Sequence, residues 1–152
     1  MILALLAAAS LQLSGDLPRT GSLSLAELQK LGTVDTVWSK HKVTGVPLDK
    51  VLAAFGFTPG EMGKDVPKAE KRRGYRKVVV ATAADGFQAV FSCAEVSSAL
   101  GPTQALVIWE LDGQPLSADT GPLRLVVPTD RETSRSLWQL VKLEVVDPAP
   151  KK

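Results

Sequence analysis

The sequence predicts a single domain of the α+β class, with a mainly antiparallel or mixed β-sheet and a few short helices. Three observations support this prediction. The chain has 152 residues, which is enough for one hydrophobic core. Apolar, β-branched runs turn back through Asp-Gly pairs at 85–86 and 112–113, which are typical of hairpins. Serine-led capping boxes open short helices, and the regular strand–helix–strand alternation of a parallel sheet is missing.

The first nine residues, Met1–Ala9, are all apolar. Such a run is too short for a transmembrane helix, which needs about 20 residues. Ala7 and Ala9 are placed as a cleavage site, so residues 1–9 are predicted to be a partial signal peptide whose usual basic region is missing. The mature protein would then begin near Ser10 and be periplasmic or secreted. The alternative is a buried or frayed N-terminal helix.

The next segments predict a loop and a short helix. Residues 10–20 are polar, contain glycine and proline, and are expected to form a lead-in loop. Ser24 and Glu27 have the spacing of a capping box, in which each side chain accepts the other residue's backbone N–H. Leucines follow at helical spacing, and Gly32 fits the end of the helix.

The middle of the chain alternates predicted structure with a long irregular stretch. Residues 34–42 are expected to form a strand, residues 45–48 a turn, and residues 48–55 a second helix. Residues 57–77 are rich in proline, glycine and charge, which favours a long loop or irregular insertion. Within it, residues 68–77 are strongly basic. This run is typical of a solvated loop, with an anionic ligand, a lipid surface or an acidic partner as alternatives.

A hairpin and a second capping box follow. Residues 77–83 and 87–91 predict two strands around the first Asp-Gly turn. Ser92 and Glu95 repeat the capping-box spacing, and the helix that they open is expected to continue to about Leu100.

The last third of the chain completes the sheet. Strands are predicted at residues 105–111, 123–127 and 141–146. Residues 129–136 are polar and flexible in character. The tail at 148–152 is rich in proline and lysine and is expected to be disordered.

Composition excludes several classes of function. The net charge is +2 and aromatic residues are 5%, so nothing favours a nucleic-acid partner. The chain has one cysteine, Cys93, and one histidine, His41. One cysteine cannot form an internal disulfide, and two such residues cannot build a structural zinc site. Cys93 is interpreted as a packing residue at a helix start, and His41 as an exposed residue near a strand end.

Five segments, in this order, resemble the sulfite-oxidase-like molybdopterin-binding domain family: Gly45-Val46-Pro47-Leu48, Asp85-Gly86-Phe87, Trp109–Leu116, Gly121–Pro128 and Trp138–Val146. The resemblance covers residues 20–147, which we take as the domain. It implies the fold of that family, and it makes molybdopterin a candidate cofactor.

The same resemblance raises the question of whether this chain has a ligand for molybdenum. Members of the family that do chemistry hold molybdenum through a pterin dithiolene and one cysteine thiolate, shortly before the Gly-Val-Pro-Leu segment. The corresponding position here is Val34 or a close neighbour, and a valine has no lone pair to give a metal. We therefore expect molybdenum to be absent, and we assign no catalytic or metal-ligating residue.

Two functions are compatible with the lack of a cysteine at the expected metal-ligand position. The first is an exported, non-catalytic binding or partner protein that has lost the metal-ligating cysteine. Its partner would be a small anionic ligand or a redox protein. The alternative is a small molybdopterin-dependent oxidoreductase, or a subunit of one, that binds the cofactor without a cysteine ligand. Whether the chain is an enzyme is left open.

The resemblance also suggests which residues would contact a cofactor. In cofactor-binding relatives, a basic residue after the Val-Val-Pro segment contacts the pyrophosphate of the pterin. Arg131 and Arg135 are the candidates here. Arg124 alternates with Leu123 and Leu125, so it is expected to point to the opposite face of its strand. The three tryptophans are interpreted as core or half-buried residues.

Overall fold

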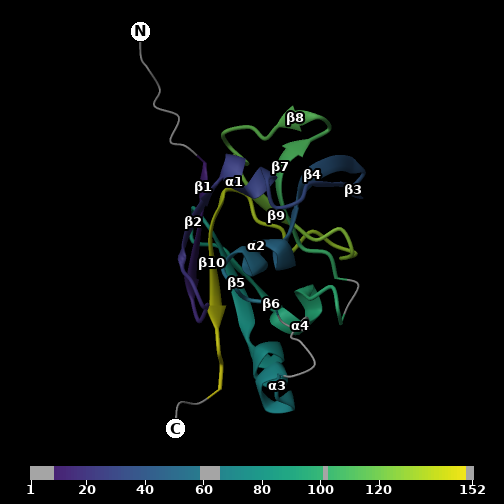
Figure 1. The fold of residues 1–152 in the computed structure, drawn as a ribbon. Coiled ribbons are helices and arrows are strands. Elements are labelled where there is room, and N and C mark those ends of the chain that lie inside the picture. The colour runs from purple at the N-terminus through teal and green to yellow at the C-terminus, as the bar shows by residue number, and fades with distance from the viewer. Residues whose placement is uncertain (1–8, 59–65, 101–102, 150–152) are drawn as a thin grey trace.

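Two five-stranded sheets form the framework in the computed structural model, which describes residues 9–58, 66–100 and 103–149 (Figure 1). The first sheet has the order β2-β1-β10-β5-β6, and the second has the order β3-β4-β7-β8 with β9 also paired to β7. The strands are β1 (Ser10–Gly15), β2 (Gly21–Ser24), β3 (Val34–Trp38), β4 (His41–Pro47), β5 (Val78–Ala83), β6 (Gln88–Ser92), β7 (Leu106–Leu111), β8 (Gln114–Pro115), β9 (Arg124–Val126) and β10 (Leu140–Val146). The helices are α1 (Leu25–Gln29), α2 (Leu48–Ala54), α3 (Lys68–Arg76) and α4 (Cys93–Val96). The α+β prediction is confirmed.

The first sheet begins with a strand that the sequence analysis missed. The expected lead-in loop at residues 10–20 is wrong, because Ser10–Gly15 forms β1. This strand runs parallel to β10, with Gln12 opposite Lys142, and antiparallel to β2. Leu11 and Leu13 are buried, while Ser10 and Gln12 are exposed, so the strand has the two-residue period of a half-buried sheet.

The second sheet corrects the prediction for residues 34–48. The expected single strand at 34–42 is a hairpin, in which Ser39 and Lys40 adopt positive φ angles between β3 and β4. The expected turn at 45–48 is the end of β4 followed directly by α2, whose N-cap is Pro47. Gly45 lies against the backbone of β7, where a side chain would collide with the Val107 carbonyl.

Two helices also differ from expectation. Part of the expected loop at 57–77 is α3, a nine-residue basic helix; residues 59–65 lie outside the described part of the chain. The helix after the second capping box ends at Val96 instead of Leu100. Both capping boxes are confirmed, with the Ser24 and Ser92 hydroxyls accepting the predicted backbone N–H groups. Most of the predicted signal peptide and the end of the tail lie outside the described residues.

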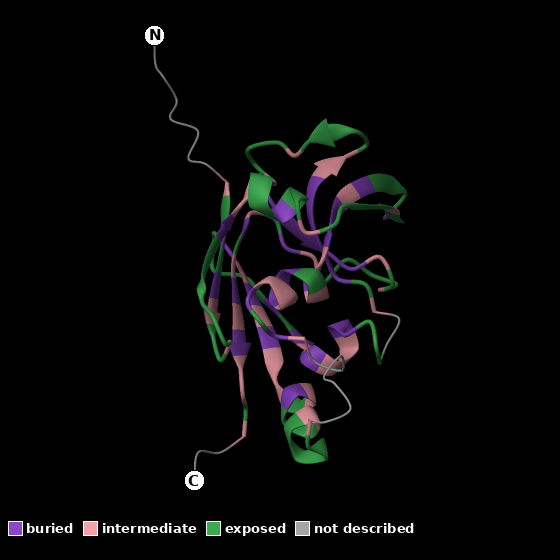
Figure 2. Cartoon of the chain, in the orientation of Figure 1, coloured by how far each residue is buried: buried purple, intermediate pink, exposed green. Residues whose placement is uncertain are grey.

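The main core joins the two sheets to α1, α2 and α4. Figure 2 shows its buried stretches along the inner strands, while α3 and β8 are mainly exposed. A smaller apolar cluster lies on the other face of the second sheet, and we call it the outer cluster: Trp38, Val43, Leu106, Ile108 and Val126. No helix within residues 9–58, 66–100 and 103–149 is long and apolar enough to cross a membrane.

Candidate functional site

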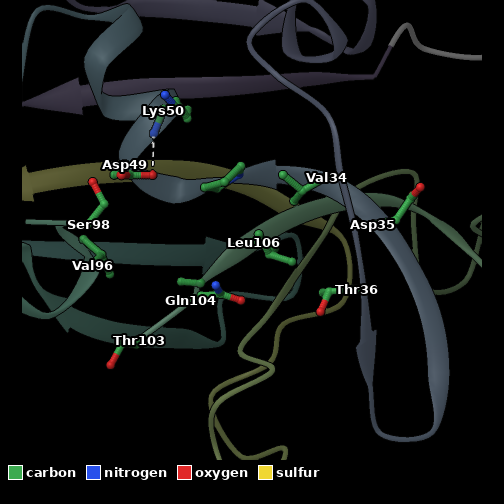
Figure 3. A pocket seen from close by; sticks show the side chains of 12 residues that line it. Val34, Asp35, Thr36, Asp49, Lys50, Val96, Ser98, Thr103, Gln104 and Leu106 are labelled. Atoms are coloured by element: carbon green, nitrogen blue, oxygen red, sulfur yellow. Dashed lines mark hydrogen bonds between the residues drawn. The ribbon is translucent and has the colours of Figure 1, made fainter. Parts of the chain in front are cut away.

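A pocket of about 620 Å3 opens at the end of the second sheet where β3 begins and α2 follows β4 (Figure 3). Its wall is formed by residues from β3, the end of β4, the start of α2, the end of α4 with the segment after it, and the start of β7. They are Val34, Asp35, Thr36, Pro47, Asp49, Lys50, Val96, Ser98, Thr103, Gln104, Ala105 and Leu106. Val34, which the resemblance suggests as the counterpart of the family's cysteine, therefore lines a cavity.

The polar groups of this pocket do not form an anion site. Asp35 and Asp49 bring two carboxylates to its wall, against one ammonium group from Lys50. The Asp35 carboxylate accepts a 2.6 Å hydrogen bond from the Thr44 hydroxyl, and Asp49 accepts the backbone N–H of Lys50 at 2.9 Å. Nor does the pocket offer a soft metal ligand, because no thiol or imidazole is among its lining residues. Within the described residues, no group of three or more His, Cys, Asp or Glu side chains could hold a metal ion.

A buried arginine, Arg124, lies on the face of the second sheet that carries the outer cluster. Arg124, in β9, is 8% exposed, and its guanidinium lies 5.0 Å from the ring centre of Trp38 and 5.5 Å from that of Trp138. Burial lowers the pKa of this guanidinium. Its Nε is buried without a hydrogen-bond partner, and no carboxylate among the described residues pairs with it. The aromatic faces compensate part of the buried charge, but the Nε donor has no acceptor among the described residues.

Arg124 and the pocket are connected through the outer cluster. Arg124 is opposite Ile108 in the β7–β9 register, and Val126 is opposite Leu106, which also lines the pocket. Leu123 and Leu125 belong to the main core, so the prediction that Arg124 points to the opposite face is confirmed. The interpretation of Trp138 as buried or half-buried is wrong, because it is 58% exposed; its ring lies beside the guanidinium.

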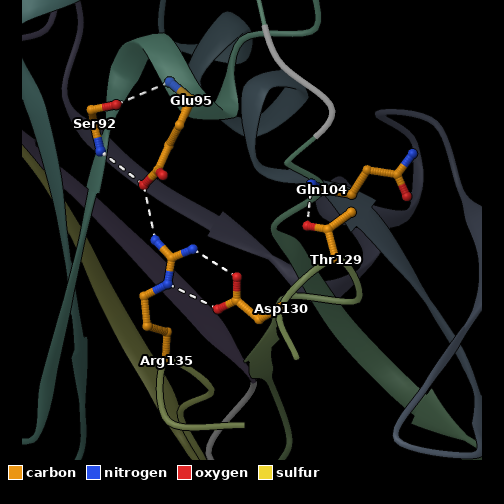
Figure 4. A network of polar contacts seen from close by, with 6 residues as sticks. All are labelled: Ser92, Glu95, Gln104, Thr129, Asp130 and Arg135. Atoms are coloured by element: carbon orange, nitrogen blue, oxygen red, sulfur yellow. Dashed lines mark hydrogen bonds and ion pairs between the residues drawn. The ribbon is translucent and has the colours of Figure 1, made fainter. Parts of the chain in front are cut away.

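The two arginines that the resemblance suggested have different surroundings. Arg135 donates from Nε and Nη2 to Asp130 at 2.9 and 2.8 Å, and from Nη1 to Glu95 at 3.0 Å (Figure 4). Its guanidinium also lies over the ring of Phe91, and these carboxylates raise its pKa. Three of its donors are therefore occupied within the domain. Arg131 is exposed and pairs with no described carboxylate. A cofactor contact by either residue stays a prediction.

Sequence reasoning did not select Arg124 as a site residue, although a signal was present. A charged residue between apolar neighbours in a short strand either faces solvent or is buried next to a partner that compensates its charge. The neighbouring rings come from β3 and from the segment before β10, and neither contact is visible in local spacing. Of the three arginines, Arg124 is the one that combines burial with an unpartnered donor.

Cys93 and His41 do not contribute to this site. Cys93 is fully buried in the main core, and desolvation raises the pKa of its thiol to about 12, so the group stays neutral and unreactive. This supports its interpretation as a packing residue. His41 is exposed, and its Nδ1 lies 2.7 Å from the Asp112 carboxylate, whose pKa is lowered chiefly by that hydrogen bond. The pair connects two hairpin turns.

Comparisons with known proteins identify the relationship. The family model described as the oxidoreductase molybdopterin binding domain matches residues 29–151. Among solved structures, the sulfane dehydrogenase SoxCD from Paracoccus pantotrophus is similar, with a TM-score of 0.63 and 17% sequence identity. The match covers 95% of this chain but 39% of the SoxCD chain, so it concerns the fold of one part of that protein. No curated protein matches the chain.

Proposed function

Because the chain belongs to the oxidoreductase molybdopterin-binding domain family, we propose that it is a binding domain that retains an anion site for the pterin cofactor but has lost thiolate ligation of molybdenum. The observation that carries this proposal is the unpartnered Nε of Arg124, buried beside two tryptophan rings. A guanidinium in this setting binds a phosphate oxygen more strongly than an exposed one, because less water competes for it.

The residues present fit the organic part of the cofactor better than its metal. Arg124 would hold an anionic phosphate group, while Trp38 and Trp138 shield the contact from water. When bound, the pterin would supply a dithiolene that can ligate a metal. The chain would have to add a thiolate, but Val34 has no donor atom, and Cys93 is buried in the core outside the pocket. The nearby carboxylates of Asp35 and Asp49 are hard ligands that suit magnesium or calcium.

We also propose that the protein acts outside the cytoplasm. The apolar run Met1–Ala9 with alanines at 7 and 9 supports this. The first strand begins at Ser10, so cleavage after Ala9 would leave every described strand and helix in place. The fold would lose one backbone hydrogen bond, from Leu25 N–H to the Ala9 carbonyl.

The decisive experiment measures pterin and metal on the same sample. The full chain is purified from a host that makes molybdopterin, and pterin fluorescence and elemental molybdenum are determined per chain. We expect pterin in the wild type with little molybdenum. Arg124→Gln should lower the pterin content by about tenfold, as expected for loss of one charge-assisted contact. Arg72→Gln, an exposed control on α3, should not. Equal pterin in both variants, or about one molybdenum per wild-type chain, would contradict the proposal.

A second pair of variants tests whether the missing thiolate is what prevents metal binding. Val34→Cys introduces a thiol on the pocket wall, and Val37→Cys introduces one on the same strand at a position that does not line the pocket. If the pterin site is retained, Val34→Cys should gain molybdenum while Val37→Cys should not. Pterin present in both variants with no metal in either would show that the lost cysteine is not the explanation.

A further inference from the structure

A basic helix projects from the end of the domain that is remote from the β3–β4 hairpin (Figure 1). This helix, α3, carries Lys68, Lys71, Arg72, Arg73 and Arg76 against one acidic residue, Glu70. Its positions differ in exposure: Lys68, Arg72 and Arg73 are exposed, whereas Gly74 is buried and Tyr75 half-buried. The helix therefore presents its cations to solvent and packs its remaining side on the domain (Figure 2).

The base of the helix is fixed to the domain by ion pairs. Arg76 makes two hydrogen bonds to the Asp147 carboxylate, at 3.0 and 2.9 Å. Lys77, directly after the helix, lies 2.9 Å from an oxygen of Asp16 and 5.2 Å from the ring centre of Phe57. These contacts hold α3 in one orientation, so the cations beyond them are displayed on an ordered scaffold.

The exposed cations themselves have no such partners. Lys68, Arg72 and Arg73 form no ion pair or hydrogen bond from their side chains within residues 9–58, 66–100 and 103–149. Three adjacent positive charges repel one another and raise the local concentration of anions. An acidic partner would relieve that repulsion.

A hollow of about 390 Å3 lies beside the helix. Its lining combines apolar atoms of Leu17, Pro18 and Phe57 with two basic groups, Arg73 and Lys77, and two carboxylates, Asp16 and Glu70. The apolar part of this hollow can accept an apolar side chain, while the unpaired cations of α3 beside it attract carboxylates. We call the three cations Lys68, Arg72 and Arg73, together with this hollow, the α3 surface.

We propose that the α3 surface is a docking site for an acidic protein partner, which places an apolar side chain in the hollow and carboxylates over the helix. A protein is favoured over a lipid bilayer for two reasons. The exposed positions of α3 hold no large apolar residue that could enter the acyl region, and stable membrane binding needs more than a short basic patch. A flat headgroup layer also leaves a hollow unfilled.

The site is independent of the proposed pterin site. The α3 surface shares no residue with Arg124 and its two tryptophans, or with the pocket lined by Val34. Failure of one proposal therefore does not affect the other. Because the charges are exposed, the interaction should be weak at physiological salt, rapid in association and stronger at low salt.

The test uses the full chain and a fluorescent acidic peptide that contains leucines among glutamates. Binding is measured by anisotropy at low and physiological salt. The variant Lys68→Glu/Arg72→Glu/Arg73→Glu is compared with Lys30→Glu/Lys40→Glu/Arg131→Glu, which changes net charge equally at exposed positions elsewhere. The corresponding glutamine triple variant replaces the first if its thermal melting is impaired. We expect about tenfold weaker binding in the α3 variant and less than about twofold change in the control.

Two further probes separate the alternatives. A peptide with serine in place of leucine should bind more weakly, because it leaves the hollow empty; equal binding would overturn the role of the hollow. Vesicles of phosphatidylserine and phosphatidylcholine should not bind. Vesicle binding that requires α3, with no peptide binding, would replace the protein partner by a membrane. Equal weakening in both triple variants would mean that net charge acts instead of the α3 surface, and would overturn the proposal.

Discussion

The contacts of Arg135 predict a specific loss of stability when its charge is removed. Arg135→Met keeps an aliphatic chain over Phe91 but deletes the three hydrogen bonds to Asp130 and Glu95. Hydrogen bonds to charged groups contribute about 1.5–3 kcal/mol each when well shielded. The side chains here are 33%, 23% and 32% exposed, so solvent screens the interaction. We expect a net loss of about 2–3 kcal/mol at pH 7.

The same interaction makes the loss depend on pH. The hydrogen bond from Arg135 lowers the pKa of Asp130 below its usual value of about 3.9. A carboxylate whose pKa is lower in the folded state stabilises the fold above its unfolded pKa, and this stabilisation disappears as the pH falls through the folded pKa. The difference in stability between wild type and Arg135→Met should therefore be full near pH 7 and shrink below about pH 4.

Urea denaturation followed by tryptophan fluorescence measures both effects, with unfolding free energies compared near pH 7 and near pH 3. Arg131→Met is the matched control, because Arg131 is exposed in the same segment and pairs with no described carboxylate. Its effect should stay within about 0.5 kcal/mol. A similarly small loss in Arg135→Met at pH 7, or a loss of equal size at both pH values, would refute the assignment of these contacts.

Three further outcomes are expected. Cys93→Ser should lower the free energy of unfolding by no more than about 1–2 kcal/mol and leave pterin content unchanged; loss of binding at an unchanged melting temperature would show a functional thiol. Gly45→Ala should destabilise by about 3 kcal/mol or more in the same assay, because its Cβ would meet the Val107 carbonyl; a neutral effect would mean that β4 and β7 separate easily. N-terminal sequencing of exported protein should begin near Ser10, and a cytoplasmic protein that retains Met1 would contradict the signal peptide.

The features predicted correctly from sequence are those encoded within a few residues. At both capping boxes, the serine and the glutamate three positions later make their reciprocal hydrogen bonds. At the first Asp-Gly turn, the Asp85 carboxylate accepts the Phe87 N–H, and Gly86 adopts a positive φ. The hydrogen bonds that define these geometries join residues two or three positions apart, so local spacing was enough to predict them.

The features that were missed depend on distant partners. β1 pairs with β10, at the other end of the chain, and its short alternating pattern was outweighed by the glycine and proline that follow it. The helix α3 has a sequence of low apolar content, but Gly74 is buried against the domain and Arg76 is paired with Asp147. Local propensity did not indicate either contact.

The candidate site also combines features that local sequence predicts with features that depend on distant residues. The alternation around Arg124 correctly placed its side chain opposite Leu123 and Leu125. Its burial beside two rings depends on how β3 and the segment before β10 approach β9, which only the tertiary fold determines. Arg135 likewise meets Glu95 across 40 positions of sequence, so a residue suggested as a cofactor contact has carboxylate partners that no motif revealed.

The position of β10 has a consequence for synthesis of the protein. This strand is the last in sequence, yet it lies in the middle of the first sheet, hydrogen-bonded to β1 on one side and β5 on the other. Until residues 140–146 have left the ribosome, β1 is paired only with β2 and β5 only with β6, so the two halves of the sheet cannot join. Nascent chains therefore carry two open strand edges, which can pair with other chains. Termination before Leu140 should yield aggregates instead of a smaller folded domain.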